Sequence, residues 1–241
     1  MKSLKKLFSD YTEIELSLGY SFQNKSLLAL ALIHRSFVNE NRDKVDSHNE
    51  RLEFLGDAIL GLLISDYLYR YLPTKPEGEL SYIRSRLVDA SSCKFYVCKL
   101  KIEQYLLMGK GERMNDGRGR DSILSNLFEA IIGAIYLDGG LEAARKFLFQ
   151  NFSEEIGKIL TRPEKNWKAE LQDYSQKKFQ QTPIYNITKE EGPDHNKTFE
   201  IEVLINNKSY GTGKGSSKKS AQQDAAEIAF KTIEERDENG Q

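Results

Sequence analysis

The chain has only two cysteines, five prolines and one tryptophan in 241 residues, and it has no long apolar run. Two cysteines are too few for the disulfide framework of a small secreted domain. The longest apolar runs, Ala58–Ile64 and Ala130–Leu137, fall well short of the roughly 20 residues that span a bilayer. No apolar stretch follows the basic segment Met1–Lys6, so we expect no signal peptide. These absences predict a cytoplasmic protein without a membrane segment.

The chain also has no excess of charge of either sign. The 35 basic and 36 acidic residues give a net charge of −1, which excludes a globally basic nucleic-acid binder. Any nucleic-acid site must therefore be a local patch. A chain of this length is long enough for two modest domains, each with its own core.

The hydrophobic pattern divides the chain into two parts. Residues 1–158 have helical spacing and no long alternating strand pattern, which predicts an all-α domain. Its apolar positions recur through Leu27–Phe37, Leu52–Tyr71, Leu80–Leu106, Ile123–Leu137 and Leu141–Ile159, with Gly139-Gly140 ending the fourth segment. The pattern resets at a linker, residues 159–164, around Thr161-Arg162-Pro163.

Residues 165–236 predict a small α+β domain in the order α-β-β-β-α, followed by a polar tail, residues 237–241. Asn166–Phe179 and the segment after Ser217 have helical patterns, and Asn206-Asn207 favours a tight turn between strands. The last helix has Ala221, Ala225, Ile228, Ala229 and Thr232 on one side. The fold class is thus multi-domain, with an all-α domain before an α+β domain.

Three carboxylates stand out in the stretch Asn49–Asp57. Glu50, Glu53 and Asp57 are separated by three and seven positions, so a helix carries them on one side. Their neighbours are apolar, and like charges beside a core repel each other and lose hydration. A bound divalent metal compensates these charges with the fewest assumptions.

A second acidic site lies in the apolar segment Ile123–Leu137. Glu129 is its only carboxylate, and an isolated buried carboxylate costs several kcal/mol, on the order of 2 or more, unless it is neutralised or coordinated. Asn126, one turn earlier, offers an amide oxygen on the same side. Two helices with oxygen ligands predict a Mg²⁺ site, with Mn²⁺ as an expected substitute.

Simpler structural roles remain open for each acid. Ser47 and Glu50 fit a helix capping box, Glu53 could pair with Arg51, and Asp57 could be solvated.

The nine residues Asn49–Asp57 resemble the diagnostic motif of the ribonuclease III family, and Ile123–Asp138 resembles its second acidic helix. His34-Arg35-Ser36 and Glu77-Gly78-Glu79-Leu80-Ser81 also match. The resemblance implies that Glu53 and Glu129 bind the catalytic metal, that Asp57 helps to activate water, and that Glu50 and Glu77 are supporting acids. It also implies that the aromatic at Phe54 packs across the interface of a homodimer.

Asn126 departs from the family pattern, which most often has Asp there. Asn still offers an oxygen ligand but removes a negative charge, so metal affinity could fall. The alternative function is therefore a duplex-RNA binder with weakened or absent cleavage.

The second domain has its own local basic patch. Val203–Gln223 contains four lysines and no acids, and Lys218 and Lys219 begin the last helix, where backbone amides already attract phosphate. A solvated basic helix start is the alternative. Residues of the first helix, the Gly192–His195 loop and Ser217–Ala221 resemble a double-stranded RNA-binding domain. The resemblance implies RNA contacts by Gln172, Gln176, His195, Lys218 and Lys219, with Lys214 peripheral.

Together the two resemblances imply a bacterial-type endoribonuclease of double-stranded RNA. Metal-activated water would give 5′-phosphate and 3′-hydroxyl ends. The expected roles are maturation of ribosomal RNA precursors and processing of structured messages.

Overall fold

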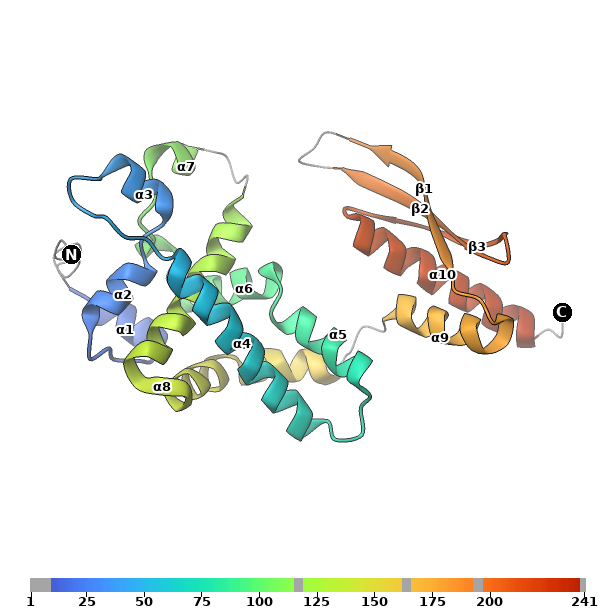
Figure 1. The fold of residues 1–241 in the computed structure, drawn as a ribbon, viewed down its shortest axis with the longest axis horizontal. Helices are drawn as coiled ribbons and strands as arrows, with labels where there is room; N and C mark the ends of the chain where they lie inside the picture. Colours follow the sequence, from blue (N-terminus) through green and yellow to red (C-terminus); the bar gives the residue numbers. More distant parts are fainter. Residues whose placement is uncertain (1–9, 115–118, 162–165, 193–196, 239–241) are drawn as a thin grey trace. The chain divides into compact units, whose positions relative to one another are not determined.

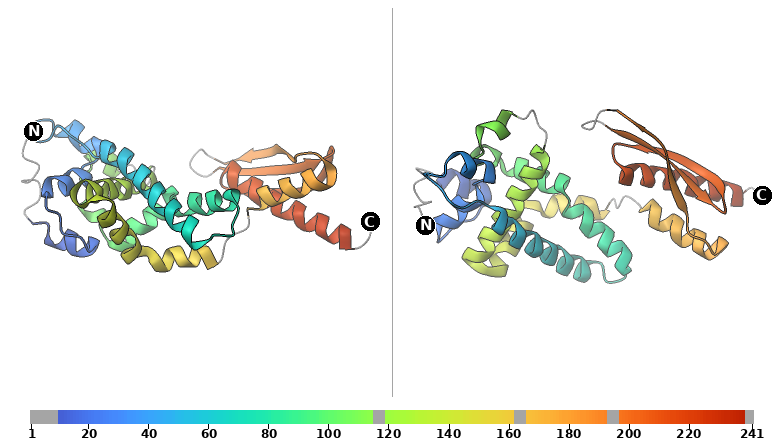
Figure 2. Two further views of the ribbon diagram at one scale, coloured as in Figure 1. Left: turned by 60° about the horizontal axis from the view of Figure 1, so that its bottom comes forward. Right: turned by 45° about the horizontal axis from the view of Figure 1, so that its top comes forward.

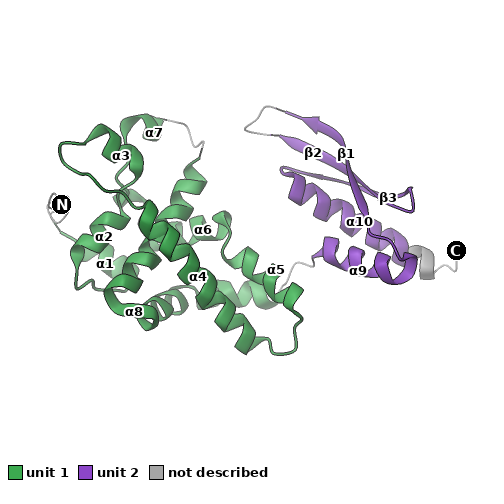
Figure 3. Ribbon diagram, in the orientation of Figure 1, with its two compact units in different colours: residues 1–163 green, residues 164–241 purple. Residues whose placement is uncertain are grey.

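A computed structural model describes residues 10–114, 119–161, 166–192 and 197–238. The chain forms two compact units, Met1–Pro163 and Glu164–Gln241, which are shown in separate colours in Figure 3. The first unit is helical in its described residues, and the second contains a three-stranded sheet with two helices. The predicted fold class is confirmed.

The first unit is built around two long helices, α4 and α8 (Figure 1). Its elements are α1 (Thr12–Leu18), α2 (Lys25–Ala31), α3 (Arg35–Glu40), α4 (Glu50–Tyr71), α5 (Glu77–Leu87), α6 (Ala90–Leu100), the 3₁₀ turn η2 (Glu103–Tyr105), α7 (Lys110–Met114) and α8 (Arg120–Thr161). The core side chains of α8 are almost continuous from Leu124 to Ile135, which explains why α4 and α6 both pack on this helix.

Helix α8 bends at the predicted glycine pair. Gly140 has a φ of 80°, a left-handed conformation that glycine adopts without a Cβ clash, and the chain then resumes helix up to Thr161. The change of direction is visible in both views of Figure 2. The predicted linker at residue 159 therefore starts too early, because the helical hydrogen bonds continue through the apolar positions Ile156 and Ile159.

The two central helices touch through glycines. A Cβ added at Gly56 of α4 would lie under 3.0 Å from the backbone carbonyl of Glu129 on α8. A Cβ added at Gly133 would clash in the same way with the carbonyl of Leu52. Since real side chains do not approach so closely, both positions require glycine for this packing. The acidic residues on either side of these glycines are thereby brought to the same crossing.

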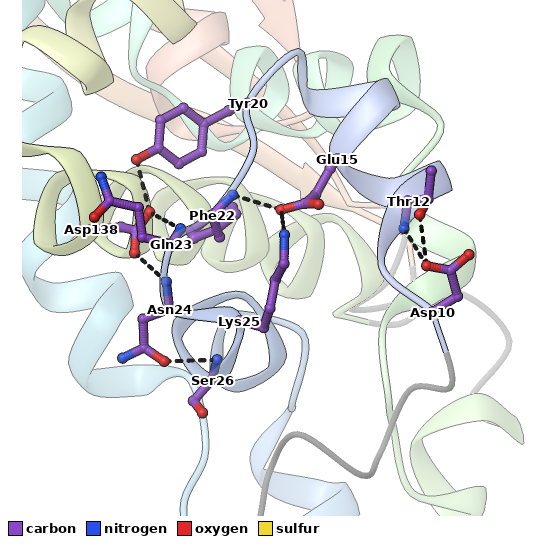
Figure 4. Close-up of polar contacts among 10 residues, drawn as sticks. All are labelled: Asp10, Thr12, Glu15, Tyr20, Phe22, Gln23, Asn24, Lys25, Ser26 and Asp138. Atoms are coloured by element: carbon purple, nitrogen blue, oxygen red, sulfur yellow. Dashed lines mark hydrogen bonds and ion pairs between the residues drawn. The ribbon is translucent and has the colours of Figure 1, made fainter.

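A polar network attaches the N-terminal helices to α8 (Figure 4). The Asp138 carboxylate accepts hydrogen bonds from the Tyr20 hydroxyl (2.9 Å) and from the backbone amides of Gln23 and Asn24 (both 2.8 Å). These bonds favour the ionised form, so the pKa of Asp138 is lowered although burial opposes the shift. Burial and this carboxylate raise the pKa of Tyr20 to about 12. The loop between α1 and α2 is thus fixed on the end of α8 before the kink.

Helix α8 is also long and apolar enough to cross a membrane by length and composition, with a mean hydropathy of 1.2 in its best window. Its apolar side chains are instead buried against α4 and α6, and Gly140 interrupts it. These features are those of the core helix of a globular domain.

The second unit has the predicted order of elements. These are α9 (Trp167–Phe179), β1 (Ile184–Glu191), β2 (Thr198–Ile205), β3 (Lys208–Gly215) and α10 (Lys218–Glu238), with an antiparallel sheet in the order β1-β2-β3. Every second residue of β2 is buried from Phe199 to Ile205, as its alternating pattern predicts. Asn206 and Asn207 have φ values of 53° and 58° in the tight turn to β3.

Two boundaries differ from the sequence prediction. The segment Leu80–Leu106 is two helices and a 3₁₀ turn, because Asp89 caps a new helix by accepting a hydrogen bond from the amide of Ser92. Helix α10 continues to Glu238, beyond the predicted end at residue 236. Of the five residues predicted on one side of α10, Ile228 is 39% exposed, whereas Ala226 and Ile233, which are outside that set, are buried.

The glycine contact yields a stability prediction. Gly56→Ala should destabilise the helical unit by about 1–3 kcal/mol, because the added methyl forces α4 and α8 apart. Gly157→Ala on α8 is the matched control, since its Cβ would meet nothing within 4 Å, and it should stabilise by about 0.5–1 kcal/mol. Thermal denaturation followed by circular dichroism measures both. Equal melting temperatures for the two variants would contradict the close approach.

Candidate metal centre and nucleic-acid interface

The crossing of α4 and α8 brings Glu53, Asp57 and Glu129 within electrostatic reach of each other. The pKa of Glu129 is raised to about 7, first by burial and then by the negative charges of Asp57 and Glu53. The hydroxyl of Ser125 reaches the Glu129 carboxylate only at 3.5 Å, which is a weak hydrogen bond. Below about pH 7, Glu129 is therefore protonated unless a bound cation stabilises its ionised form.

The ionised carboxylate of Glu53 is destabilised in the same way. Its pKa is raised by burial and by Glu50 and Asp57, against a hydrogen bond from the Asn126 amide that lowers it. The Oε2 atom of Glu53 is buried and has no hydrogen-bond partner. A buried carboxylate oxygen without a donor is costly, so this atom has one coordination position to offer.

The donor set fits a hard divalent cation. Carboxylates from two helices interact electrostatically at the crossing, Asn126 contacts Glu53 there, and one Glu53 oxygen has no hydrogen-bond partner. Within the described part of the chain, no three His, Cys, Asp or Glu side chains form a closed group that could hold a metal ion. A closed group is not needed by Mg²⁺, which keeps several waters and binds through one or two carboxylates.

Glu50 does not close a capping box. Helix α4 begins at Glu50 after Asn49, and no side chain caps it, so Ser47 has no capping role. The Glu50 carboxylate lies 3.4 Å from the Arg35 guanidinium and 3.7 Å from Nδ1 of His48. Its charge also contributes to the raised pKa of Glu53. Glu50 thus belongs to the edge of the acidic cluster.

The structure gives different answers for the simpler structural roles of Glu53 and Asp57. Glu53 makes no ion pair with Arg51 or with any other base among the described residues, and its hydrogen-bond donor is Asn126. Asp57 is exposed, as a solvated acid would be, but its charge still acts on Glu53 and Glu129.

Glu77 lies apart from this cluster in the single chain. It begins α5, which follows the far end of α4 from Glu50, and its carboxylate accepts a hydrogen bond from the Ser81 hydroxyl at 2.7 Å. It is not among the charges that shift Glu53 or Glu129. The predicted supporting role of Glu77 is therefore not provided within one chain.

In the second unit, exposed polar side chains form a row along α9. Gln172 and Gln176 are both exposed and one turn apart, as expected. Lys168 precedes Gln172 by one turn, donates to Oε1 of Gln222 on α10 at 2.8 Å, and lies 5.0 Å from the centre of the Tyr185 ring. Sequence reasoning missed Lys168 and Gln222, although their spacing of four residues from Gln172 and Lys218 is a signal for both.

The lysines at the start of α10 are exposed, and Gln222, the residue that Lys168 of α9 contacts, lies one turn after Lys218. Lys218 and Lys219 are the first residues of the helix, and the Lys218 ammonium lies 5.7 Å from the centre of the Phe199 ring. Gly213 and Gly215 on β3 have no room for a Cβ against α10, so the helix lies directly on the strand. Its N-terminus and two lysines are therefore held in a fixed position on this unit, where phosphate is attracted.

Lys214 lies on β3 rather than on α10. Its ammonium pairs with Glu200 on β2 at 3.1 Å, and its backbone amide donates to Asp224 at 2.8 Å. The Lys214 side chain is 69% exposed, so this surface ion pair is weak, and the peripheral phosphate contact of Lys214 stays a prediction. His195 lies outside the described residues.

Comparisons with known proteins agree with both units. A family model described as ribonuclease-III-like matches residues 24–156, and a double-stranded RNA binding motif matches residues 167–233. Ribonuclease 3 of Protochlamydia amoebophila is 60% identical over 234 residues, which cover 97% of this chain and 96% of that protein. Ribonuclease 3 of Borreliella burgdorferi is 44% identical and covers 90% of this chain and 89% of its own length.

Solved structures resemble the helical unit. The nuclease domain of ribonuclease III from Campylobacter jejuni is 38% identical, with a TM-score of 0.55, and the match covers 61% of this chain and 97% of that domain. A second structure of that domain is described as showing structural flexibility in a region involved in dimer formation; it is 40% identical, with a TM-score of 0.53, and covers 60% of this chain and 99% of that one. The chain thus belongs to the ribonuclease III family, with a helical nuclease domain followed by a double-stranded RNA-binding motif.

Proposed function

We propose that this endoribonuclease hydrolyses phosphodiester bonds of double-stranded RNA with Mg²⁺ held between α4 and α8. One observation carries the proposal: Glu129 has a pKa near 7 beside a buried, unpaired oxygen of Glu53, at the crossing of two core helices. Such an arrangement is unfavourable in the empty protein and favourable around a dication. Glu53 and Glu129 would hold the ion, and Asn126 orients Glu53 through its amide.

When bound, Mg²⁺ lowers the pKa of a coordinated water and offsets the charge of the departing oxygen. Asp57, exposed and one turn after Glu53, holds the attacking water by accepting its hydrogen bond and takes its proton. Attack at phosphorus breaks the bond to the 3′ oxygen, which acquires a proton from solvent. The products have a 3′-hydroxyl and a 5′-phosphate.

The second unit supplies duplex recognition in this proposal. The polar row of α9 and the lysines of α10 match the way A-form RNA is bound, through shape, 2′-hydroxyls and phosphates. We also infer a cytoplasmic role in processing ribosomal RNA precursors and structured messages, which sequencing of cleaved transcripts in the source cell would test.

A homodimer is part of the proposal. Phe54, Leu62 and Tyr69 lie on one face of α4 and are exposed, and they form an apolar stripe beside the acidic cluster. The related Campylobacter domain is described as having a region involved in dimer formation. Light scattering of the full chain decides the point, because a monomeric mass at working concentration would refute it.

The catalytic role of Glu129 is tested by Glu129→Gln. Cleavage of a long RNA duplex should fall by more than ~100-fold, since even residues that only support a metal ligand contribute 10–100-fold. Glu142→Gln is the control, because Glu142 is an exposed acid on the same helix. Equal cleavage by both variants would remove Glu129 from the mechanism. Tight duplex binding by the wild type without cleavage in Mg²⁺ would favour the binding-only function.

The raised pKa of Glu129 predicts a pH-dependent stability of the metal-free protein. The folded pKa of about 7 exceeds the ordinary Glu value of 4.5, so the contribution of Glu129 to stability is fully present below about pH 4.5 and is lost as pH rises through 7. Without divalent ions, the melting temperature should fall as pH rises from about 4.5 to 7 and level off above pH 7, where Glu129 is ionised in both states. Millimolar Mg²⁺ should reduce this slope, and Glu129→Gln should remove its main source. A flat metal-free profile would contradict the shift.

The α10 lysines are tested by Lys218→Ala/Lys219→Ala. Duplex affinity should fall, and the slope of log K against log salt should decrease by about 2, because each phosphate contact contributes about 0.9. Lys177→Ala/Lys231→Ala removes the same charge from other exposed positions and is the control. An unchanged slope in the first variant would exclude these lysines from phosphate binding.

A further inference from the structure

A cationic hollow of about 430 Å³ opens on the nuclease unit between α3 and the start of α4. Two valines line its apolar part, and its polar lining consists of Arg35, Asn39, Arg42, Asp46 and His48. Two guanidinium groups, an imidazole and an amide thus outnumber one carboxylate. The lining offers many hydrogen-bond donors to an anion.

The hollow adjoins the acidic cluster through Glu50. Arg35 and His48 line the hollow and are also the residues that approach the Glu50 carboxylate, at 3.4 and 3.7 Å. Both distances are long, and the Arg35 side chain is 62% exposed, so this ion pair contributes little to stability. Arg35 can therefore exchange Glu50 for another anion at small cost.

The imidazole of His48, which also lines the hollow, has one ring nitrogen without a hydrogen-bond partner. Nδ1 of His48 is buried and has no hydrogen-bond partner, because its approach to Glu50 is too long for one. A group with oxygen acceptors in the hollow would satisfy this nitrogen when the imidazole carries a proton there. The hollow thus has positive charge and one buried ring nitrogen, that of His48, without a partner.

The position of the hollow beside the acidic cluster indicates that the anion it binds is an RNA phosphate. Glu50 precedes Glu53 by three residues of α4, a rise of about 4.5 Å along the helix. An RNA strand that reaches Glu53, Asp57 and Glu129 brings further phosphates, which these acids repel. Guanidinium forks match phosphate geometry and offset that repulsion. A bound cation is disfavoured in the hollow for the same reason.

We propose that this hollow is a phosphate subsite, which holds a non-scissile phosphate of the RNA strand beside the one that is cleaved. The subsite rests on the proposed cleavage of RNA and adds to it the residues that position the strand on the nuclease unit. Arg35 leaves Glu50 for the phosphate, and Arg42 and His48 complete the contacts.

The test compares Arg35→Ala/Arg42→Ala with Lys146→Ala, which removes an exposed charge of α8 outside the hollow. Duplex binding is measured against salt in a Glu129→Gln background, so that the RNA stays intact. The double variant should bind at least ~10-fold more weakly, and its salt slope should fall by about 1–2. With Glu129 present, its KM should rise more than its kcat falls, because the contact is uniform in ground and transition states.

Two further measurements keep the result clear. Arg35→Lys/Arg42→Lys keeps the charge and should restore most of the slope, and circular dichroism checks the fold of each variant. Inorganic phosphate, titrated while the His48 ring is observed by NMR, separates a free-ion site from a strand site. Phosphate binding with an unchanged duplex slope would overturn the proposal and leave an adventitious ion site only.

The outcomes separate the two proposals. If the wild type cleaves duplex RNA and the double variant keeps its salt slope, the subsite alone fails. If the wild type does not cleave in Mg²⁺ but the slope still falls in the double variant, the phosphate contact stands and the proposed chemistry fails.

Discussion

The close approach of α4 and α8 at Gly56 and Gly133 is the constraint on which the nuclease unit depends. Without side chains at these positions, each helix meets the backbone of the other. Glu53 and Asp57 flank the glycine of α4, and Glu129 supplies the carbonyl against which Gly56 packs. The contact that buries the core thus also determines how near the carboxylates lie. Packing and chemistry are set by one geometry.

That geometry has an energetic cost. Three acids share a partly buried crossing, so Glu129 and Glu53 have raised pKa values and one Glu53 oxygen is unsatisfied. Folding would be more favourable with apolar residues there, as is common at sites kept for function. Asn126 moderates the cost, because its amide donates to Glu53 and adds no further negative charge. At this position an amide therefore stabilises the neighbouring acid, where another carboxylate would repel it.

The RNA-binding unit uses glycines for a similar purpose. Gly213 and Gly215 let α10 lie directly on β3, and hydrogen bonds from Lys168 to Gln222 and from Gln223 to Asn166 join α9 to α10. The row of polar groups is therefore held on a rigid support within this unit. Lys214 on β3 lies outside this row and pairs with an acid on the neighbouring strand.

The sequence by itself determined the element types, the two-part organisation and the acids of the candidate centre. Helical and alternating periodicities report directly which side of a segment is buried, and a carboxylate in an apolar helix is too costly to be incidental. Only the tertiary structure decided which groups meet. The long continuation of α8, the separation of Glu77 from the cluster, the Lys214–Glu200 pair and the joining of Arg35 and His48 around Glu50 all depend on contacts between distant segments. Local spacing carries no information about such contacts, because they arise when separate elements pack and exclude water between them.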